Sequence, residues 1–171
     1  MNADNLRALQ APLKDRYRSE PGAAKVTLRA QGSLDASSLS CKVETGRALA
    51  VAGLHPATGG SGLELCSGDM LLEALVACAG VTLKAVATSM GVTLRSGKVS
   101  AEGDLDFRGT LGVDKQAAVG FTDIRLKFEL DTDAPQAQLD TLLKLTERYC
   151  VVLQTLKTAP KIEASLDRAG A

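Results

Sequence analysis

The stretch LEALVACAGVTL, residues 72–83, lies in the middle of a segment, 68–90, that is apolar nearly all round. This pattern predicts a long helix without a solvent face, which belongs at the centre of a protein. Gly91 follows the segment in the position of a C-terminal cap. We therefore expect the fold to be built around this helix, which carries Cys78 near its middle.

Patterns on both sides of the helix favour an α+β protein with an antiparallel sheet rather than alternating parallel βαβ units. Leucines at helical spacing predict helical structure from Asp131 to Leu156, which Pro160 ends. Alternating apolar residues and turn signals predict strands at 25–30, 38–44, 48–51, 92–107 with an interruption at 96–97, 119–130 and 161–166. Residues 67 and 69 are expected to cap the central helix.

The first 22 residues are interpreted as a separate N-terminal extension. Leu6, Leu9 and Leu13 are spaced three and four apart, which predicts a short amphipathic helix over 5–18. Residues 23–171 are expected to form one domain, because a chain of 171 residues suits a single core.

Composition argues against several classes of partner. The chain has 20 basic and 20 acidic residues, so no overall field would attract nucleic acid or an anionic membrane. Aromatic residues make up 3% of the chain, which leaves few surfaces for base stacking. The apolar run 70–87 contains Glu73 and Lys84 and is near the minimum length of a spanning helix, about 18 residues. We interpret it as core and expect a small, largely aliphatic ligand.

The N-terminus shows no basic start followed by an apolar stretch, so we expect no signal peptide and a cytoplasmic location. A reducing compartment argues against structural disulfides among Cys41, Cys66, Cys78 and Cys150. With one histidine, His55, and no Cys-x-x-Cys, we expect neither a metal nor a cofactor. The glycine-rich loop 59–62 lacks the Lys-Ser/Thr ending of a phosphate-binding loop.

Cys78 allows two interpretations, inert packing or a placed nucleophile. Burial raises the pKa of a thiol, so a reactive Cys78 needs a nearby cation, with an Arg as the expected activator. Cys66, 12 positions earlier, would lie roughly 18 Å away along a helix, too far for a disulfide. Cys150 belongs to another element and is the better candidate to resolve an oxidised Cys78.

Other candidate residues have simpler interpretations. Cys66 at a helix N-terminus could be reactive in its own right, but packing under the glycine-rich loop is the favoured interpretation. Cys41 is interpreted as packing, and His55 as a residue that shapes its loop or lines a pocket. Glu73 is interpreted as a surface or interface charge, with catalysis as the alternative.

Two stretches resemble the OsmC/Ohr family. Residues 67–78 resemble its central-helix motif, in which an acidic residue and a Leu-rich stretch lead to Ala-Cys. Glu147-Arg148-Tyr149-Cys150 resembles its second cysteine motif. The resemblance covers about residues 23–168. It implies an OsmC-like fold as an intertwined homodimer, in which strands of both chains wrap two long central helices and the reactive sites lie at the subunit interface.

The resemblance also implies a function. Family members of the peroxidase type reduce organic hydroperoxides, so Cys78 would attack the peroxide and Cys150 would close a disulfide. Dithiols, including dihydrolipoyl groups, regenerate such enzymes. We therefore expect a Cys-based antioxidant peroxidase. The alternative is a non-catalytic OsmC-like dimer that binds a small apolar ligand or serves a structural or stress role.

Two positions differ from the family pattern. Gly68 stands where the peroxidase branch often has Glu. The nearest acid, Asp69, would lie roughly 13 Å along the helix from Cys78, so it could hold an Arg but not touch the sulfur. Val151 stands where Pro usually follows the second cysteine, so the helix there is expected to begin differently.

The activating Arg of the family comes from the early strand region. Arg47 and Arg29 are the candidates in this chain, although no Gly-Arg-Asp-Gly turn is present. The expected catalytic residues are Cys78, Cys150, Asp69 and Arg47.

Overall fold

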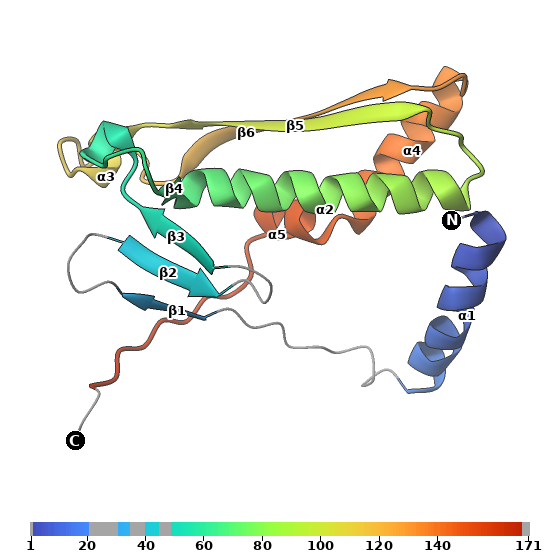
Figure 1. Ribbon diagram of the computed structural model, residues 1–171, viewed down its shortest axis with the longest axis horizontal. Coiled ribbons are helices and arrows are strands. Elements are labelled where there is room, and N and C mark those ends of the chain that lie inside the picture. Colours follow the sequence, from blue (N-terminus) through green and yellow to red (C-terminus); the bar gives the residue numbers. More distant parts are fainter. Residues whose placement is uncertain (1, 21–30, 35–39, 45–48, 169–171) are drawn as a thin grey trace.

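A long helix, α2 (Ser67–Ser89), forms the axis of the structure (Figure 1). The computed structural model describes residues 2–20, 31–34, 40–44 and 49–168. The expected strand 25–30 and both candidate arginines, Arg29 and Arg47, lie outside this part of the chain.

The predicted central helix is confirmed, but its N-terminal cap differs from the expectation. The N-cap residue is Cys66, whose side chain makes no capping hydrogen bond, and residues 67 and 69 lie in the first turn. At the other end Gly91 has φ 70°, a left-handed conformation that suits glycine after a helix. Asp69 still complements the positive end of the helix dipole from the first turn.

Within the described part of the chain, α2 is buried mainly along one side. Its buried residues form a stripe at helical spacing: Leu75, Ala79, Leu83, Val86 and Ala87. By length and composition α2 could cross a membrane, and 28% of its most apolar window is buried. Because β5, α4 and α5 pack against it, we retain the interpretation as a core helix.

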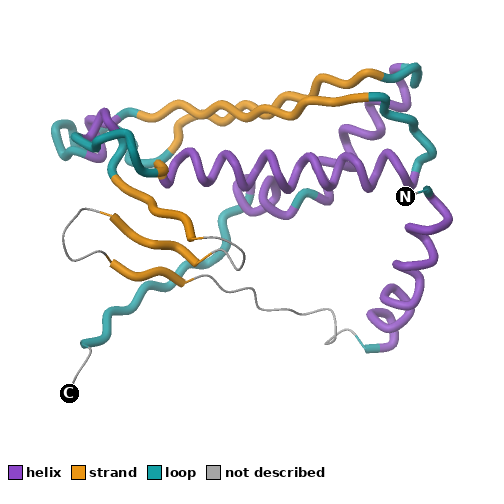
Figure 2. The backbone as a smooth tube through the Cα atoms, viewed as in Figure 1, coloured by secondary structure: helices purple, strands orange, loops and turns teal. Residues whose placement is uncertain are grey.

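A long antiparallel hairpin lies along α2 (Figure 2). It consists of β5 (Ser96–Leu105) and β6 (Phe121–Asp131), paired from Ser96↔Asp131 to Leu105↔Phe121 with one register shift. The sequence prediction placed the start of β5 too early, because residues 92–95 form the connection after α2. In this connection buried Val92 donates its N–H to the Ala87 carbonyl. The short helix α3 (Phe107–Thr110) was not predicted.

Two helices follow the hairpin, where the sequence predicted continuous helical structure. They are α4 (Gln136–Tyr149) and α5 (Val151–Lys157), separated at Cys150, which has extended backbone angles. Leu142 of α4 packs with Leu83, Val86 and Val92 in one core cluster. A second cluster contains Leu75, Ala79 and Cys150.

The N-terminal strands form a separate sheet in the order β1-β2-β3-β4. The strands are β1 (Gln31–Leu34), β2 (Ser40–Glu44), β3 (Leu49–Gly53) and β4 (Leu65–Cys66). The predictions at 38–44 and 48–51 are confirmed for the described residues. The pairing is antiparallel except between β3 and β4, which are parallel.

The predicted N-terminal helix is also present, as α1 (Ala3–Ser19). It starts near the C-terminal end of α2 and extends away from it (Figure 1). It belongs to neither sheet.

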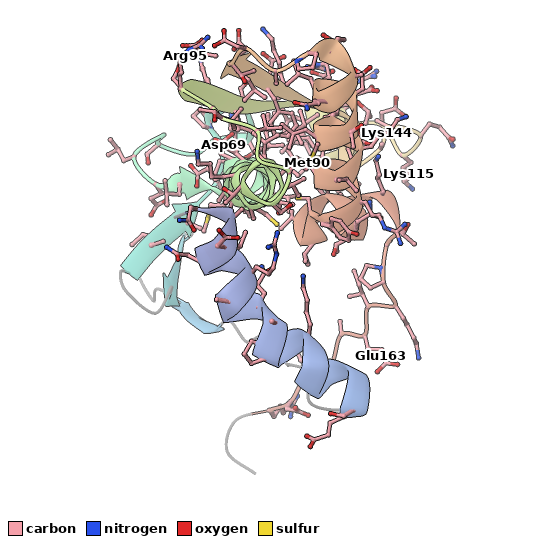
Figure 3. The ribbon with its side chains drawn as sticks, turned by 90° about the vertical axis from the view of Figure 1, so that its right-hand side faces the viewer. Asp69, Met90, Arg95, Lys115, Lys144 and Glu163 are labelled. Atoms are coloured by element: carbon pink, nitrogen blue, oxygen red, sulfur yellow. The ribbon has the colours of Figure 1, made fainter. Side chains whose placement is uncertain are left out.

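The predicted last strand, 161–166, is wrong for the single chain. These residues have no regular secondary structure, and Ile162 and Leu166 are 81% and 93% exposed. Figure 3 shows Glu163 on this segment, away from the body of the molecule. Alternation of apolar and polar side chains is not sufficient for a strand, because the backbone needs a hydrogen-bonding neighbour.

Candidate thiol site

The structure brings Cys78 and Cys150 into contact. Cys78 lies on α2 and is half-buried, whereas Cys150 lies at the break between α4 and α5 and is completely buried. Both are free thiols in the same apolar cluster. The two thiols lie close enough that each shifts the pKa of the other. Two residues 72 positions apart in the sequence thus form one site.

The break at Cys150 places backbone donors at this site. The Cys150 N–H closes α4 by donating to the Thr146 carbonyl at 2.9 Å, and the Cys150 carbonyl accepts from Gln154 N–H at 2.9 Å. The first N–H groups of a helix have no partner within it. Those of Val151 and Val152 donate to the Cys78 sulfur.

A side chain of α2 supplies a further donor. Thr82 lies four residues after Cys78, on the same face of the helix, and its hydroxyl donates to the Cys78 sulfur. The Cys78 sulfur therefore faces donors from its own helix and from the α4–α5 break.

The two thiols differ in their readiness to ionise. Burial raises the pKa of Cys78, but the hydrogen bonds from Val152 N–H, the Cys150 thiol, Val151 N–H and Thr82 outweigh it, so that pKa lies below its ordinary value. Burial raises the pKa of Cys150, and its bond to Cys78 adds to the rise. Of the two thiols, Cys78 is therefore the one that ionises at the lower pH.

The surroundings of the pair are apolar. Side chains from the hairpin and from α5 pack against it: Val99, Ala101, Ile124, Leu126, Phe128, Val152, Leu153 and Leu156. In such surroundings hydrogen bonds to a charged sulfur are stronger than in water. The arrangement provides a nucleophile with a second thiol next to it.

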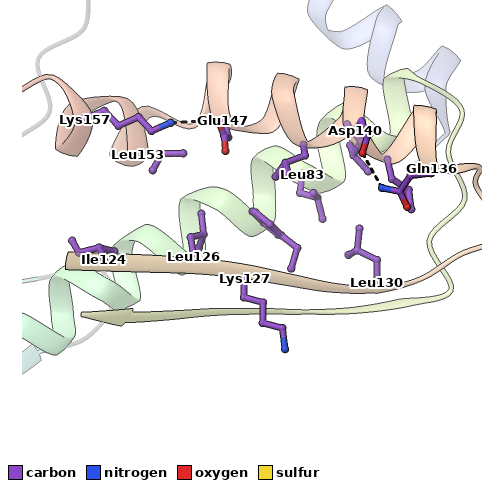
Figure 4. A pocket seen from close by; sticks show the side chains of 14 residues that line it. Leu83, Ile124, Leu126, Lys127, Leu130, Gln136, Asp140, Glu147, Leu153 and Lys157 are labelled. Carbon is purple, nitrogen blue, oxygen red and sulfur yellow. Dashed lines mark hydrogen bonds and ion pairs between the residues drawn. The ribbon is translucent and has the colours of Figure 1, made fainter. Parts of the chain in front are cut away.

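A cleft of about 550 Å³ lies beside the thiols, between β6 and the helices α4 and α5 (Figure 4). Leu153, Ile124 and Leu126 line it and also pack against the cysteine cluster. At its rim Lys157 pairs with Glu147 at 3.3 Å. The cleft is therefore aliphatic inside and polar at the edge.

Asp69 lies elsewhere. It lines a separate cavity of about 330 Å³ at the start of α2, together with Cys66, His55, Phe107 and Phe121. The His55 ring stacks on Phe107 with centroids 4.9 Å apart, and its Nδ1 accepts the Ala57 N–H at 3.0 Å. Figure 3 shows Asp69 at the side of α2. The structure does not bring this carboxylate to the thiol pair.

Among the side chains that the structure describes, none of the groups that shift the pKa of Cys78 is an arginine. Arginines that pair with carboxylates in the described part of the chain are Arg7, Arg95, Arg108 and Arg125. Arg148 lies over the ring of Tyr149. Among these same residues, no group of three or more His, Cys, Asp or Glu could hold a metal ion.

Sequence reasoning missed three donors at the site: Thr82 and the N–H groups of Val151 and Val152. A threonine four residues after a helical cysteine is a signal for the first. The absence of Pro after Cys150 is a signal for the N–H of Val151, because Pro has no N–H.

Comparisons with known proteins agree with the fold. A family model described as OsmC-like protein matches residues 60–165. A search of curated proteins found no match. An OsmC like protein from Mycoplasma pneumoniae is 16% identical with a TM-score of 0.65, over 79% of this chain and 90% of that one.

Two further solved structures have names that refer to organic hydroperoxide resistance. The protein from Legionella pneumophila is 15% identical with a TM-score of 0.61, over 79% of this chain and 92% of its own. The protein from Elizabethkingia anophelis, with thiocyanate bound, is 13% identical with a TM-score of 0.62, over 80% and 91%. These likenesses confirm the expected fold. Since the family model matches more than half of its residues, the chain belongs to the OsmC-like family.

Proposed function

We propose that this chain is a thiol peroxidase that reduces organic hydroperoxides, with Cys78 as the attacking thiol and Cys150 as the resolving thiol. Family membership and neighbours named for organic hydroperoxide resistance indicate a redox or stress role. The observation that carries the finer proposal is the thiol pair, in which the pKa of Cys78 is lowered and that of Cys150 is raised.

The first step oxidises Cys78. Its thiolate attacks the terminal oxygen of the hydroperoxide, an S–O bond forms and the O–O bond breaks. The alkoxide takes a proton from water and leaves as an alcohol. Cys78 becomes a sulfenic acid, and the peroxide has accepted two electrons.

The second step closes the disulfide. The Cys150 thiol loses its proton and attacks the Cys78 sulfur, so that an S–S bond forms and the hydroxyl leaves with the proton as water. A dithiol then exchanges with the disulfide, restores both thiols and is itself oxidised. We propose a lipoyl-type dithiol as this reductant and the cytoplasm as the location.

We also propose that the working form is a homodimer. On α2 the exposed residues Leu71, Ala74, Ala77 and Val81 follow one another at spacings of three or four, so they form an apolar stripe next to Cys78. Exposed apolar stripes of this kind mark interaction sites. A second copy of α2 is the partner that fits, and the segment 161–166 would gain a strand neighbour in such an assembly.

The experiment compares the wild type with Cys78→Ser, Cys150→Ser and Cys66→Ser during treatment with cumene hydroperoxide and dihydrolipoamide. We expect the wild type and Cys66→Ser to consume hydroperoxide and to form one Cys78–Cys150 disulfide, detected by peptide mass spectrometry. Cys78→Ser should lose consumption. Cys150→Ser should accumulate a sulfenic acid at Cys78. A wild type that keeps its thiols reduced under excess hydroperoxide would overturn the proposal.

The aliphatic cleft supports a second candidate function, a dimer that binds a small apolar ligand without catalysis. Ligand retained after purification, together with an unreactive Cys78, would favour it over the peroxidase.

A further inference from the structure

We propose that Gln154 is a positioning residue of the thiol site, whose side-chain amide binds the Glu147 carbonyl and thereby maintains the break between α4 and α5 at Cys150. The inference rests on the proposed function, because it assigns a role in the placement of the attacking and resolving thiols. Its test uses a reaction that does not involve hydroperoxide, so the two can fail separately.

The hydrogen bonds at the end of α4 change partner at Glu147. The Cys150 N–H donates to the Thr146 carbonyl at 2.9 Å, which is the regular bond of an α-helix. In a continuous helix the next bond would run from the Val151 N–H to the Glu147 carbonyl. The Glu147 carbonyl instead accepts the side-chain Nε2 of Gln154 at 2.7 Å. The side chain of Gln154 thus takes the place of one backbone donor.

This exchange of donors allows the backbone to turn. The last carbonyls of an α-helix have no partner within it, and a side chain can supply one. Because Gln154 satisfies the Glu147 carbonyl, the Val151 N–H is not required there. The extended backbone of Cys150, with φ −73° and ψ 106°, turns this N–H away from α4.

The packing of the thiols depends on the break. Cys150 is completely buried in one cluster with Leu75 and Ala79 of α2. Cys78 and Val152 pack against the same cluster. Cys150 is the N-cap residue of α5, so the first N–H groups of α5 have no helical partner. If α4 continued through Cys150, these N–H groups would bond to carbonyls of α4 and be lost to the site.

The residue after Cys150 does not enforce the break. Pro at position 151 would exclude a continuous helix, because Pro lacks an N–H and its ring clashes with the carbonyl four residues earlier. Val151 has neither property. The ion pair of Lys157 with Glu147 joins two exposed side chains at 3.3 Å and leaves the Glu147 carbonyl to Gln154 (Figure 4).

The variant that tests this is Gln154→Met, which keeps the length and the neutral charge of the side chain but removes the donor. Gln154 is exposed, so little packing changes. We expect α4 and α5 to join in a fraction of the molecules. The thiolate fraction of Cys78 near neutral pH should then fall roughly 2- to 10-fold, as for partial loss of hydrogen bonds to a charged group.

The measurement is the rate of iodoacetamide alkylation at Cys78 against pH, followed by mass spectrometry of the Cys78 peptide, and the pH midpoint gives the ionised fraction. Gln136→Met is the matched control. Gln136 is also exposed, and its Nε2 donates to the Asp140 side chain at 2.8 Å, away from the break. This control should keep the wild-type profile. Circular dichroism establishes that each variant is folded.

A double variant separates this role from a general loosening of α5. In Val151→Pro the Pro ring maintains the break without help from residue 154. Adding Gln154→Met should therefore leave the profile of Val151→Pro unchanged, so the two substitutions are not additive. The Val152 N–H is still present in this background, and its loss would be seen as a further shift.

Three results would overturn the inference: a folded Gln154→Met with the wild-type profile, a Gln136→Met that shifts equally, or a Gln154→Met substitution that shifts the profile of Val151→Pro as much as that of the wild type. If the expected pattern is found in a protein that consumes no hydroperoxide, the positioning role of Gln154 stands and the peroxidase proposal fails.

Discussion

Cys78 and Cys150 share one apolar cluster but have opposite chemical character. Desolvation acts on both thiols. For Cys78 the hydrogen-bond donors outweigh desolvation, whereas for Cys150 desolvation and the neighbouring Cys78 outweigh the lowering of its pKa by the N–H groups of Leu153 and Val152. The proposed attacking and resolving roles follow from this difference in the direction of the two pKa shifts.

The lowered pKa of Cys78 predicts the pH dependence of the pair. An acid whose pKa is lowered ionises at lower pH, so alkylation should rise with pH and level off below the range of an ordinary thiol. A second ionisation, of Cys150, should follow above that range. Absorbance at 240 nm during titration reports both steps when Cys41 and Cys66 are replaced by Ser.

The variant Cys150→Ala should remove the upper step. It should also move the lower step upward, because Cys78 loses one donor. A single step at the ordinary thiol value in the wild type would contradict the difference between the two thiols.

At this scale the sequence identified the two thiols but not their donors. A spacing of 72 positions does not give a distance, so Cys150 was linked to Cys78 only because it lies on a different element from Cys78 and matches the second cysteine motif of the family. Thr82 was not identified because helical periodicity gives its face but not the direction of its hydroxyl. Asp69 was considered because it is the nearest acid to Gly68, and the structure places it in the cavity of Cys66.

Among the elements, the break between α4 and α5 has the greatest effect on the site. Apolar residues from Leu139 to Leu156 keep helical spacing across Cys150, so the sequence pattern predicts no interruption. In the structure the backbone at Cys150 is extended, with φ −73° and ψ 106°. This turns the first N–H groups of α5 towards α2. The spacing of apolar residues shows which side chains face the core, but it does not show where the backbone changes direction.

The variant Val151→Pro tests the contribution of the break. Pro is well accepted at the first position of a helix, and the extended backbone of Cys150 suits the residue before Pro. Val151 is 69% exposed, so little packing is lost. The variant should fold normally but lack one donor to Cys78, and the thiolate fraction near neutral pH should fall roughly 3- to 10-fold.

The measurement is again alkylation of Cys78 against pH, with Val151→Ala as the control that keeps the N–H. An unchanged profile in folded Val151→Pro would show that this N–H does not act on the sulfur.

The whole molecule, as one chain, leaves much apolar surface uncovered. The sequence correctly predicted that α2 is apolar on nearly every side. It did not predict that part of this apolar surface is exposed in the single chain, where Val81 on α2 is 73% exposed. The segment 161–166 has the alternation of a strand but no neighbour. The exposed apolar side chains of α2 and the unpaired segment 161–166 have one physical explanation. An apolar pattern in the sequence predicts every surface that is buried in the working assembly, including surfaces that a single chain cannot bury.

The proposed dimer is tested by a charge on this stripe. In Val81→Glu a carboxylate would be buried against a second α2 without a partner, which costs several kcal/mol. We expect the dimer dissociation constant to rise by at least about 100-fold, so sedimentation velocity at micromolar concentration should show monomer. Val113→Glu is the matched control, because Val113 is also 73% exposed but lies outside α2, after α3. Its dimer should persist. If both variants remain dimeric, the stripe is not the interface.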